Sequence, residues 1–188
     1  MIGVGGCVYL SLDNKIVGSL LFTVGLYTIV LNGLYLFTGK VGYLVNEKPR
    51  YLFTLVVTWL GNLAGTYIAA QLMCISRIGW INAGGICDAA AASATAKLSQ
   101  SPLSAFVLAI FCGILMYVGV DGYKESKNPL ILFACVSVFI LCGFEHCIAN
   151  MFYFSLGGAW SAKAVGYILV MTLGNAVGGM LLPAMKRL

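Results

Sequence analysis

The chain has 188 residues, of which 61% are hydrophobic and only 9% are charged, and its formal net charge is +5. Soluble domains carry about 25% charged residues. This composition therefore excludes a water-exposed surface over most of the chain and predicts an all-α integral membrane protein. The basic residues lie near the ends of apolar segments, which argues against nucleic acid as a partner.

Apolar runs along the chain predict its membrane segments. Four runs contain no Asp, Glu, Lys, Arg or His, and each exceeds the roughly 20 residues that a transmembrane helix needs; they are 16–39, 51–76, 98–120 and 164–185. A longer apolar stretch, 128–162, is interrupted only by Glu145 and His146 and predicts a broken helix. Residues 1–12 are apolar but too short to span, and predict a truncated first helix whose beginning is absent.

The two halves of the chain repeat a pattern, with units of about 1–76 and 98–188. In each half an apolar helix runs into a polar break, near Thr38 and near Asn150, and a span with a Gly-Asn element follows. Asn62 follows Thr38 by 24 residues, and Asn175 follows Asn150 by 25. Three helices per unit predict six transmembrane segments in two inverted repeats, with broken second and fifth helices, in one channel domain over 1–188.

Broken backbone at membrane depth is tolerated only where protein buries it or where it lines a cavity. Both breaks should therefore face a pathway, and half-helix N-termini there favour an anion. We expect Asn62 and Asn175 to bond to the broken segments, because an unpartnered amide in lipid is costly. The glycines four residues apart beside each asparagine are expected to pack helices closely. We expect Glu145 to bond the backbone of the break.

The distribution of basic residues sets the expected orientation. Placing both termini in the cytoplasm puts six basic residues inside and four outside, which fits the positive-inside rule; the inside set is Lys48, Arg50, Lys124, Lys127, Lys186 and Arg187, and the outside set is Lys15, Arg77, Lys97 and Lys163. The seven cysteines lie mostly in apolar runs and form no C-x-x-C pair. We therefore expect neither disulfides nor metal ligands, and no cofactor.

The string Gly-Phe-Glu-His-Cys-Ile-Ala-Asn-Met-Phe over 143–152 resembles a signature of the formate/nitrite transporter family. The Leu-Phe-Thr break at 36–38 and both Gly-Asn elements resemble the family too. The resemblance implies an aquaporin-like fold, a homopentamer in the inner (plasma) membrane, and a pore in each protomer for small monovalent anions. Formate and nitrite are the expected substrates, and hydrosulfide is the alternative.

The resemblance also implies roles for individual residues. His146 would be the central pore histidine and Thr38 the threonine facing it. Five apolar side chains match positions that narrow the pore, namely Phe22, Leu26, Leu36, Phe37 and Phe139. Lys97 resembles a lysine bordering the outer vestibule, and Glu145, Asn150, Asn62 and Asn175 would support the breaks. Gly113 stands where many members carry an asparagine, which is a departure from the family pattern.

His146 is the only side chain of the sequence whose ordinary pKa lies near neutrality. We expect it to give a proton or a hydrogen bond to the crossing anion, with Thr38 as a second donor, so protons are potential partners. Two readings of another class remain. An intramembrane enzyme would need a nucleophile, metal or second acid within reach of His146, and the sequence has one histidine, no second buried carboxylate pair and no cysteine pair. A non-conducting scaffold or a truncated fragment would lack anion flux.

Overall fold

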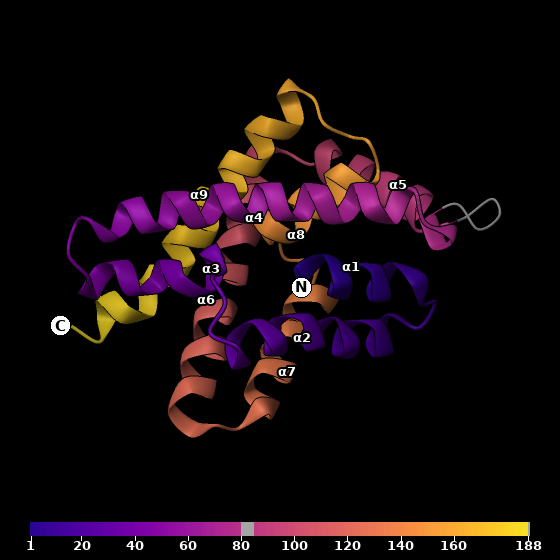
Figure 1. The fold of residues 1–188 in the computed structure, drawn as a ribbon. Helices are drawn as coiled ribbons and strands as arrows, with labels where there is room; N and C mark the ends of the chain where they lie inside the picture. The colour runs from indigo at the N-terminus through magenta and orange to yellow at the C-terminus, as the bar shows by residue number, and fades with distance from the viewer. Residues whose placement is uncertain (80–84, 188) are drawn as a thin grey trace.

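A computed structural model describes residues 1–79 and 85–187, and within these ranges every regular element is helical (Figure 1). The elements follow in the order α1 (Ile2–Ser11), α2 (Lys15–Leu31), α3 (Phe37–Lys40), η1 (Val41–Asn46), α4 (Tyr51–Cys74), η2 (Arg77–Gly79), α5 (Ile86–Ser99), α6 (Pro102–Ser126), α7 (Pro129–Leu141), α8 (Cys147–Leu156) and α9 (Ala162–Met185).

Three of these helices, α4, α6 and α9, are long and apolar enough to cross a membrane. Four shorter helices, α1, α2, α7 and α8, are also apolar. The uncharged run 16–39 does not form one continuous helix, because α2 ends at Leu31 and helix resumes only at Phe37. The runs of 51–76, 98–120 and 164–185 coincide with the three long helices.

The ends of α2 and α7 share one geometry that explains why both helices stop. Gly33 and Gly143 adopt φ values of +64° and +69°, a left-handed conformation that glycine adopts without strain. The N–H groups of Gly33 and Leu34 donate to the carbonyls of Val30 and Ile29. The same pair of bonds closes α7 through Gly143 and Phe144. This Schellman termination ends each helix several residues before the polar motif that follows.

The helices α6 and α9 cross so closely that side chains are excluded from the contact. A Cβ atom added to Gly178 would lie 1.9 Å from the carbonyl oxygen of Ile110, and one added to Gly113 would lie 2.3 Å from the carbonyl oxygen of Asn175. Gly113 therefore faces the backbone of α9, and an amide side chain would not fit there. The glycine at position 113, where the family pattern has an asparagine, is thus explained by a close helix–helix contact.

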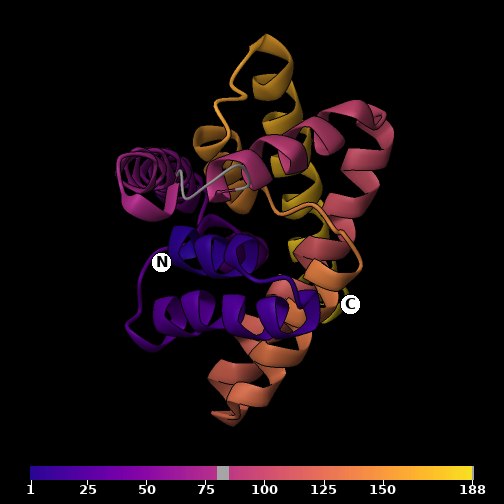
Figure 2. The ribbon, with the colours of Figure 1, turned by 90° about the vertical axis from the view of Figure 1, so that its right-hand side faces the viewer.

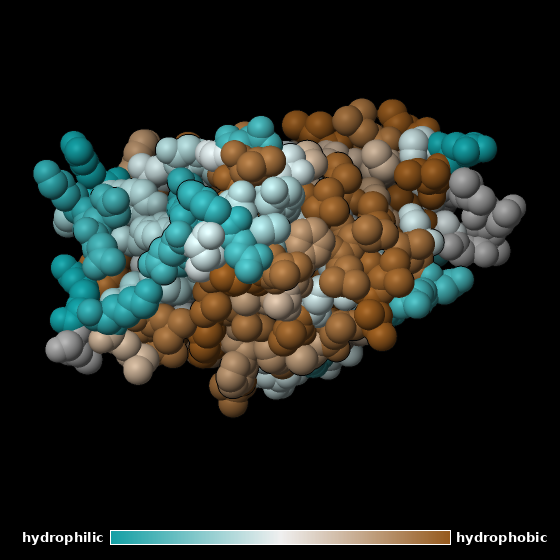
Figure 3. All heavy atoms as spheres, turned by 90° about the horizontal axis from the view of Figure 1, so that it is seen from below, coloured by the Kyte–Doolittle hydropathy of each residue, from teal (hydrophilic) through white to brown (hydrophobic). Residues whose placement is uncertain are grey.

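At the other side of the molecule, α4 lies at the edge of the helix assembly. Figure 2 views α4 nearly along its axis and places α1 beside it, with α2 on the far side of α1. A Cβ added to Gly61 or Gly65 would meet no atom within 4 Å, so this glycine pair packs against nothing within the chain. Figure 3 shows polar residues gathered at the end of the molecule near the C terminus, and apolar residues across its middle.

Candidate functional site

Two asparagines hold the starts of α3 and α8. The Oδ1 atom of Asn62 accepts the backbone N–H of Phe37 at 2.9 Å, and Oδ1 of Asn175 accepts that of Cys147 at 2.9 Å. Each amide group also donates into the break, Asn62 to the carbonyl of Tyr35 and Asn175 to that of Glu145. The asparagines thus satisfy backbone groups that the first helical turn leaves unpaired.

Helix α3 and the start of α8 meet at a direct contact between Thr38 and His146. Thr38 lies in α3 and His146 caps the N-terminus of α8, and Oγ1 of the threonine is 2.8 Å from Nε2 of the histidine. Their exposed fractions are 1% and 3%. Residues 108 positions apart in the chain are therefore brought together inside the protein.

The second ring nitrogen of His146 fixes the tautomer of the imidazole. Nδ1 lies 3.0 Å from the backbone nitrogen of Ala149, and a backbone N–H can only donate. Nδ1 must therefore accept, so the neutral ring carries its proton on Nε2 and donates it to Thr38. An imidazolium ring would lose the bond to Ala149. The Thr38 hydroxyl keeps its own proton for another acceptor.

Aromatic rings cover one side of His146. The Phe139 ring stacks on the imidazole with centroids 5.7 Å apart and an interplanar angle of 19°, and Phe22 meets Phe139 edge-on at 6.3 Å. A cavity of about 170 Å³ begins at these rings. Its lining also includes Lys97, Asn150 and two tyrosines that the sequence did not single out, Tyr9 and Tyr153.

A second cavity of about 40 Å³ runs along the residues that flank Thr38. Leu26 and Leu36 line it, and so do Lys40 and Lys124. The two cavities share no lining residue. His146 lines the larger one, and Leu36 and Gly39, on either side of Thr38, line the smaller one. Phe37 is buried but lines neither cavity.

Neither Lys40 nor Lys124 was predicted to line the pore, and Lys124 was counted only among the cytoplasmic basic residues. The position of Lys40 directly after Phe-Thr-Gly in the first break was the available signal. Lys124 needed the fold, because its place in the last turn of α6 says nothing about a cavity beside α2. Each cavity is thus lined by at least one lysine. Lys40 and Lys124 favour an anion in the smaller cavity, whereas the charge of Lys97 is paired with Glu145.

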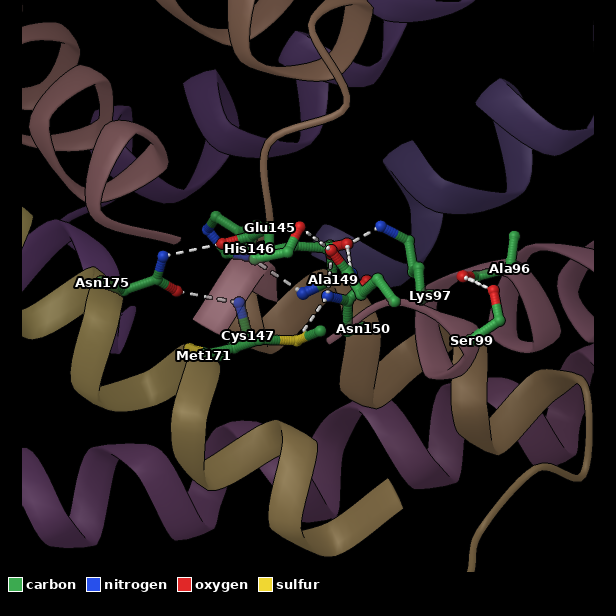
Figure 4. Close-up of polar contacts among 12 residues, drawn as sticks. Ala96, Lys97, Ser99, Glu145, His146, Cys147, Ala149, Asn150, Met171 and Asn175 are labelled. Carbon is green, nitrogen blue, oxygen red and sulfur yellow. Dashed lines mark hydrogen bonds and ion pairs between the residues drawn. The ribbon is translucent and has the colours of Figure 1, made fainter. Parts of the chain in front are cut away.

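The carboxylate of Glu145 has partners other than those expected (Figure 4). It accepts hydrogen bonds from three side chains, Lys97 at 2.6 Å, Gln100 at 2.7 Å and Asn150 at 2.7 Å. The expected bond from this carboxylate to the backbone of the break is therefore wrong. The physical reason is that Asn175 and His146 already satisfy the backbone groups of the break. The buried carboxylate is instead paired with one cation and accepts hydrogen bonds from two amides.

This arrangement consists of long apolar helices, two chain interruptions that meet at a hydroxyl–imidazole contact, and two lysine-bearing cavities. It defines a membrane transport protein of the channel type. The model of the family described as formate/nitrite transporter matches residues 1–187, and the chain belongs to this family.

Two similar proteins agree with this assignment. The chain is 28% identical over 200 residues to the formate channel FocA of Haemophilus influenzae, covering 88% of this chain and 70% of the relative. It is 30% identical over 198 residues to a probable formate transporter of Methanothermobacter thermautotrophicus, covering 88% and 71%.

A solved structure described as a pentameric formate channel with formate bound matches with a TM-score of 0.84 and 28% identity, covering 99% of this chain and 90% of that one. These similarities establish the family, a helical membrane channel as the fold, and transport rather than enzymatic catalysis as the activity. The roles of the individual residues remain predictions.

Proposed function

We propose that the chain conducts small monovalent weak-acid anions, formate or nitrite first, through a pore in each protomer that passes His146 and Thr38. One observation carries this proposal: the Thr38–His146 contact at 2.8 Å joins His146, which lines one lysine-bearing cavity, to Thr38, whose neighbours Leu36 and Gly39 line another. The substrate class is taken from the formate channel and the probable formate transporter that the chain resembles.

The proposed architecture has six membrane segments in one channel domain, formed by inverted units over about 1–76 and 98–188. In it α2 with α3 and η1 forms the second segment, and α7 with α8 forms the fifth. The equivalent Schellman ends at Gly33 and Gly143 and the equivalent asparagine bonds support this pairing. We place the chain in the inner membrane of the cell with both termini in the cytoplasm, following the basic residues.

The proposed path starts on one side beside Lys97, whose charge is paired with Glu145, and on the other side at Lys40 and Lys124, which raise the local concentration of anions. Phe22 and Phe139 narrow the path on the Lys97 side, and Leu26 and Leu36 narrow it on the other. At the centre the anion competes with Thr38 for the Nε2 proton of His146. A donated hydrogen bond, or the proton itself, lowers the cost of moving a charge through an apolar passage.

A homopentamer is the proposed assembly. Residues 32–35 of the first interruption are exposed in the single chain, beside Gly61 and Asn62 of α4. Irregular backbone at membrane depth requires protein cover. An adjacent protomer would supply that cover and would pack against the open Gly61 and Gly65 face. The similarity to the solved pentameric formate channel supports the number five.

The test is stopped-flow anion uptake into proteoliposomes that contain the purified chain. We would compare formate, nitrite, hydrosulfide and chloride, for the wild type and His146→Ala. Selective uptake of one weak-acid anion, altered by the substitution, is the expected result. Preference for hydrosulfide would correct the substrate. No uptake by folded pentamers would overturn the proposal in favour of a non-conducting scaffold.

A matched pair of variants tests the central contact. Thr38→Val keeps the shape of the side chain but removes the hydroxyl, and Thr38→Ser keeps the hydroxyl. We expect Thr38→Val to change the uptake rate roughly tenfold, because a buried Nε2–H without a partner costs about 1–3 kcal/mol. Thr38→Ser should stay within about threefold of wild type. Equal rates for the two variants would remove the hydroxyl from the mechanism.

A further inference from the structure

Two thiols lie in contact where α4 ends and α5 begins. The Sγ atoms of Cys74 and Cys87 are 3.4 Å apart, and Cys74 also donates to the carbonyl of Leu156 at 3.6 Å. Cys74 is the last residue of α4, and Cys87 lies in the first turn of α5. The pair therefore joins three segments, because Leu156 ends α8.

We propose that Cys74 and Cys87 form a reversible dithiol–disulfide site that ties the start of α5 to the end of α4. A disulfide needs the sulfur atoms to approach from 3.4 Å to about 2.0 Å. Both thiols already point at each other, so the movement is small. The sequence analysis expected no disulfide, because these cysteines are thirteen positions apart and form no C-x-x-C motif; the proposal departs from that expectation on the contact of the two sulfur atoms.

The two cysteines have different roles: Cys74 reacts first with an oxidant, and Cys87 resolves the mixed disulfide. Cys74 is partly exposed, whereas Cys87 is 3% exposed. The Cys74 thiolate attacks a small-molecule or protein disulfide, releases one thiolate and forms a mixed disulfide. Cys87 then loses its proton, attacks the Cys74 sulfur and releases the second thiolate. The oxidant disulfide gains two electrons and becomes two thiols, while the two cysteines lose two electrons and two protons.

The bond would constrain a helix that reaches the proposed pore centre. α5 packs mainly on α8, and its last turn carries Lys97, whose Nζ atom is 2.6 Å from Glu145 next to His146. Anchoring the first turn of α5 to α4 therefore fixes the opposite end of the helix that supplies this lysine. In the orientation given under Proposed function, on which this step alone depends, the pair faces the outer compartment, where disulfides persist.

The first experiment maps the thiols of the purified wild-type chain and needs no transport. The reduced protein is treated with oxidised glutathione, quenched in acid, unfolded and alkylated, and its peptides are analysed by mass spectrometry. We expect a peptide that links Cys74 to Cys87, with the other five of the seven cysteines alkylated. Seven alkylated cysteines, a link from Cys7 to Cys87, or only intermolecular links would overturn the proposal.

Three variants sharpen the result. Cys87→Ser removes the resolving thiol, so the mixed disulfide with glutathione should persist at Cys74. Cys142→Ser is the matched control, because Cys142 is exposed and lies at the end of α7, and it should leave the Cys74–Cys87 link intact. Cys74→Ser should protect Cys87 from glutathione. Rapid glutathione addition to Cys87 in that variant would contradict the assigned order of attack.

A second measurement addresses the helix itself. Amide hydrogen exchange in the first turn of α5 should slow at least threefold in the oxidised wild type and remain unchanged in Cys87→Ser. Unchanged exchange in a chain that carries the bond would overturn the claim that the bond constrains α5. Either result stands apart from the uptake assay, so a failure of the anion-channel proposal and a failure of the thiol proposal are distinguishable.

Discussion

The Nζ atom of Lys97 lies 2.6 Å from Oε2 of Glu145, and the carboxylate of this pair is 3% exposed. The pair joins the end of α5 to the residue before His146. Lys97→Met would leave a buried carboxylate with two neutral donors, Gln100 and Asn150. Breaking a buried pair from one side costs about 3–5 kcal/mol. We expect a corresponding fall in the thermal unfolding midpoint of the purified protein. Tryptophan fluorescence monitors the unfolding.

The double variant Lys97→Met with Glu145→Gln is the control for this prediction. It removes both charges and keeps a hydrogen-bonding side chain at position 145, so it should regain part of the lost stability. A thermal midpoint of Lys97→Met equal to that of the wild type would contradict a stabilising ion pair. A double-mutant cycle over positions 97 and 145 that gives no interaction energy would show that the two residues are not coupled.

Asn175 and Asn62 make equivalent bonds in different surroundings. Asn175 is fully buried, and its amide also donates to the carbonyl of Ala109, whereas Asn62 is half-buried. Asn175→Ala leaves buried backbone groups unpaired at about 1–3 kcal/mol each. We expect its free energy of unfolding in detergent to fall by more than that of Asn62→Ala. Equal losses in the two variants would place the asparagines in equal environments.

Substitutions of glycines in α9 and α4 distinguish helix packing within one chain from the proposed packing between chains. Gly178→Ala places a Cβ 1.9 Å from the Ile110 carbonyl oxygen and should cost about 3 kcal/mol or more, seen as a lower thermal midpoint. Gly61→Leu meets no atom within 4 Å of the added Cβ in the chain. It should leave the folded protomer intact and reduce the pentamer fraction in native mass spectrometry. A fully pentameric Gly61→Leu variant would move the proposed interface elsewhere.

The buried thiol in the first turn of α5 gives a pH-dependent prediction. Burial, with smaller contributions from Cys74, Asp88 and Cys7, raises the pKa of the Cys87 thiol to about 12. Because the thiolate is the nucleophile, its fraction grows about tenfold per pH unit below that pKa. Maleimide labelling of Cys87, quantified by peptide mass spectrometry, should therefore accelerate continuously from pH 7 to pH 9. A Cys87 labelling rate that levels off in this range would indicate an ordinary thiol.

The sequence by itself determined the class of protein and much of the candidate site. An uncharged run cannot stay in water, and the charged and polar interruptions identified the regions around Thr38 and His146. The signature around His146 named the family. Composition and spacing carried this information because the bilayer constrains helix length and charge so strongly.

Tertiary structure decided what those residues touch. The contact between Thr38 and His146, the three side-chain donors to Glu145, and the thiol pair of Cys74 and Cys87 each join distant segments. The position of Lys124 beside a cavity depends on how α6 packs against α2 and α3. Helix ends at Leu31 and Leu141 depend on left-handed glycines. Hydropathy measures the preference of each residue for lipid, and it contains no term for such pairwise contacts.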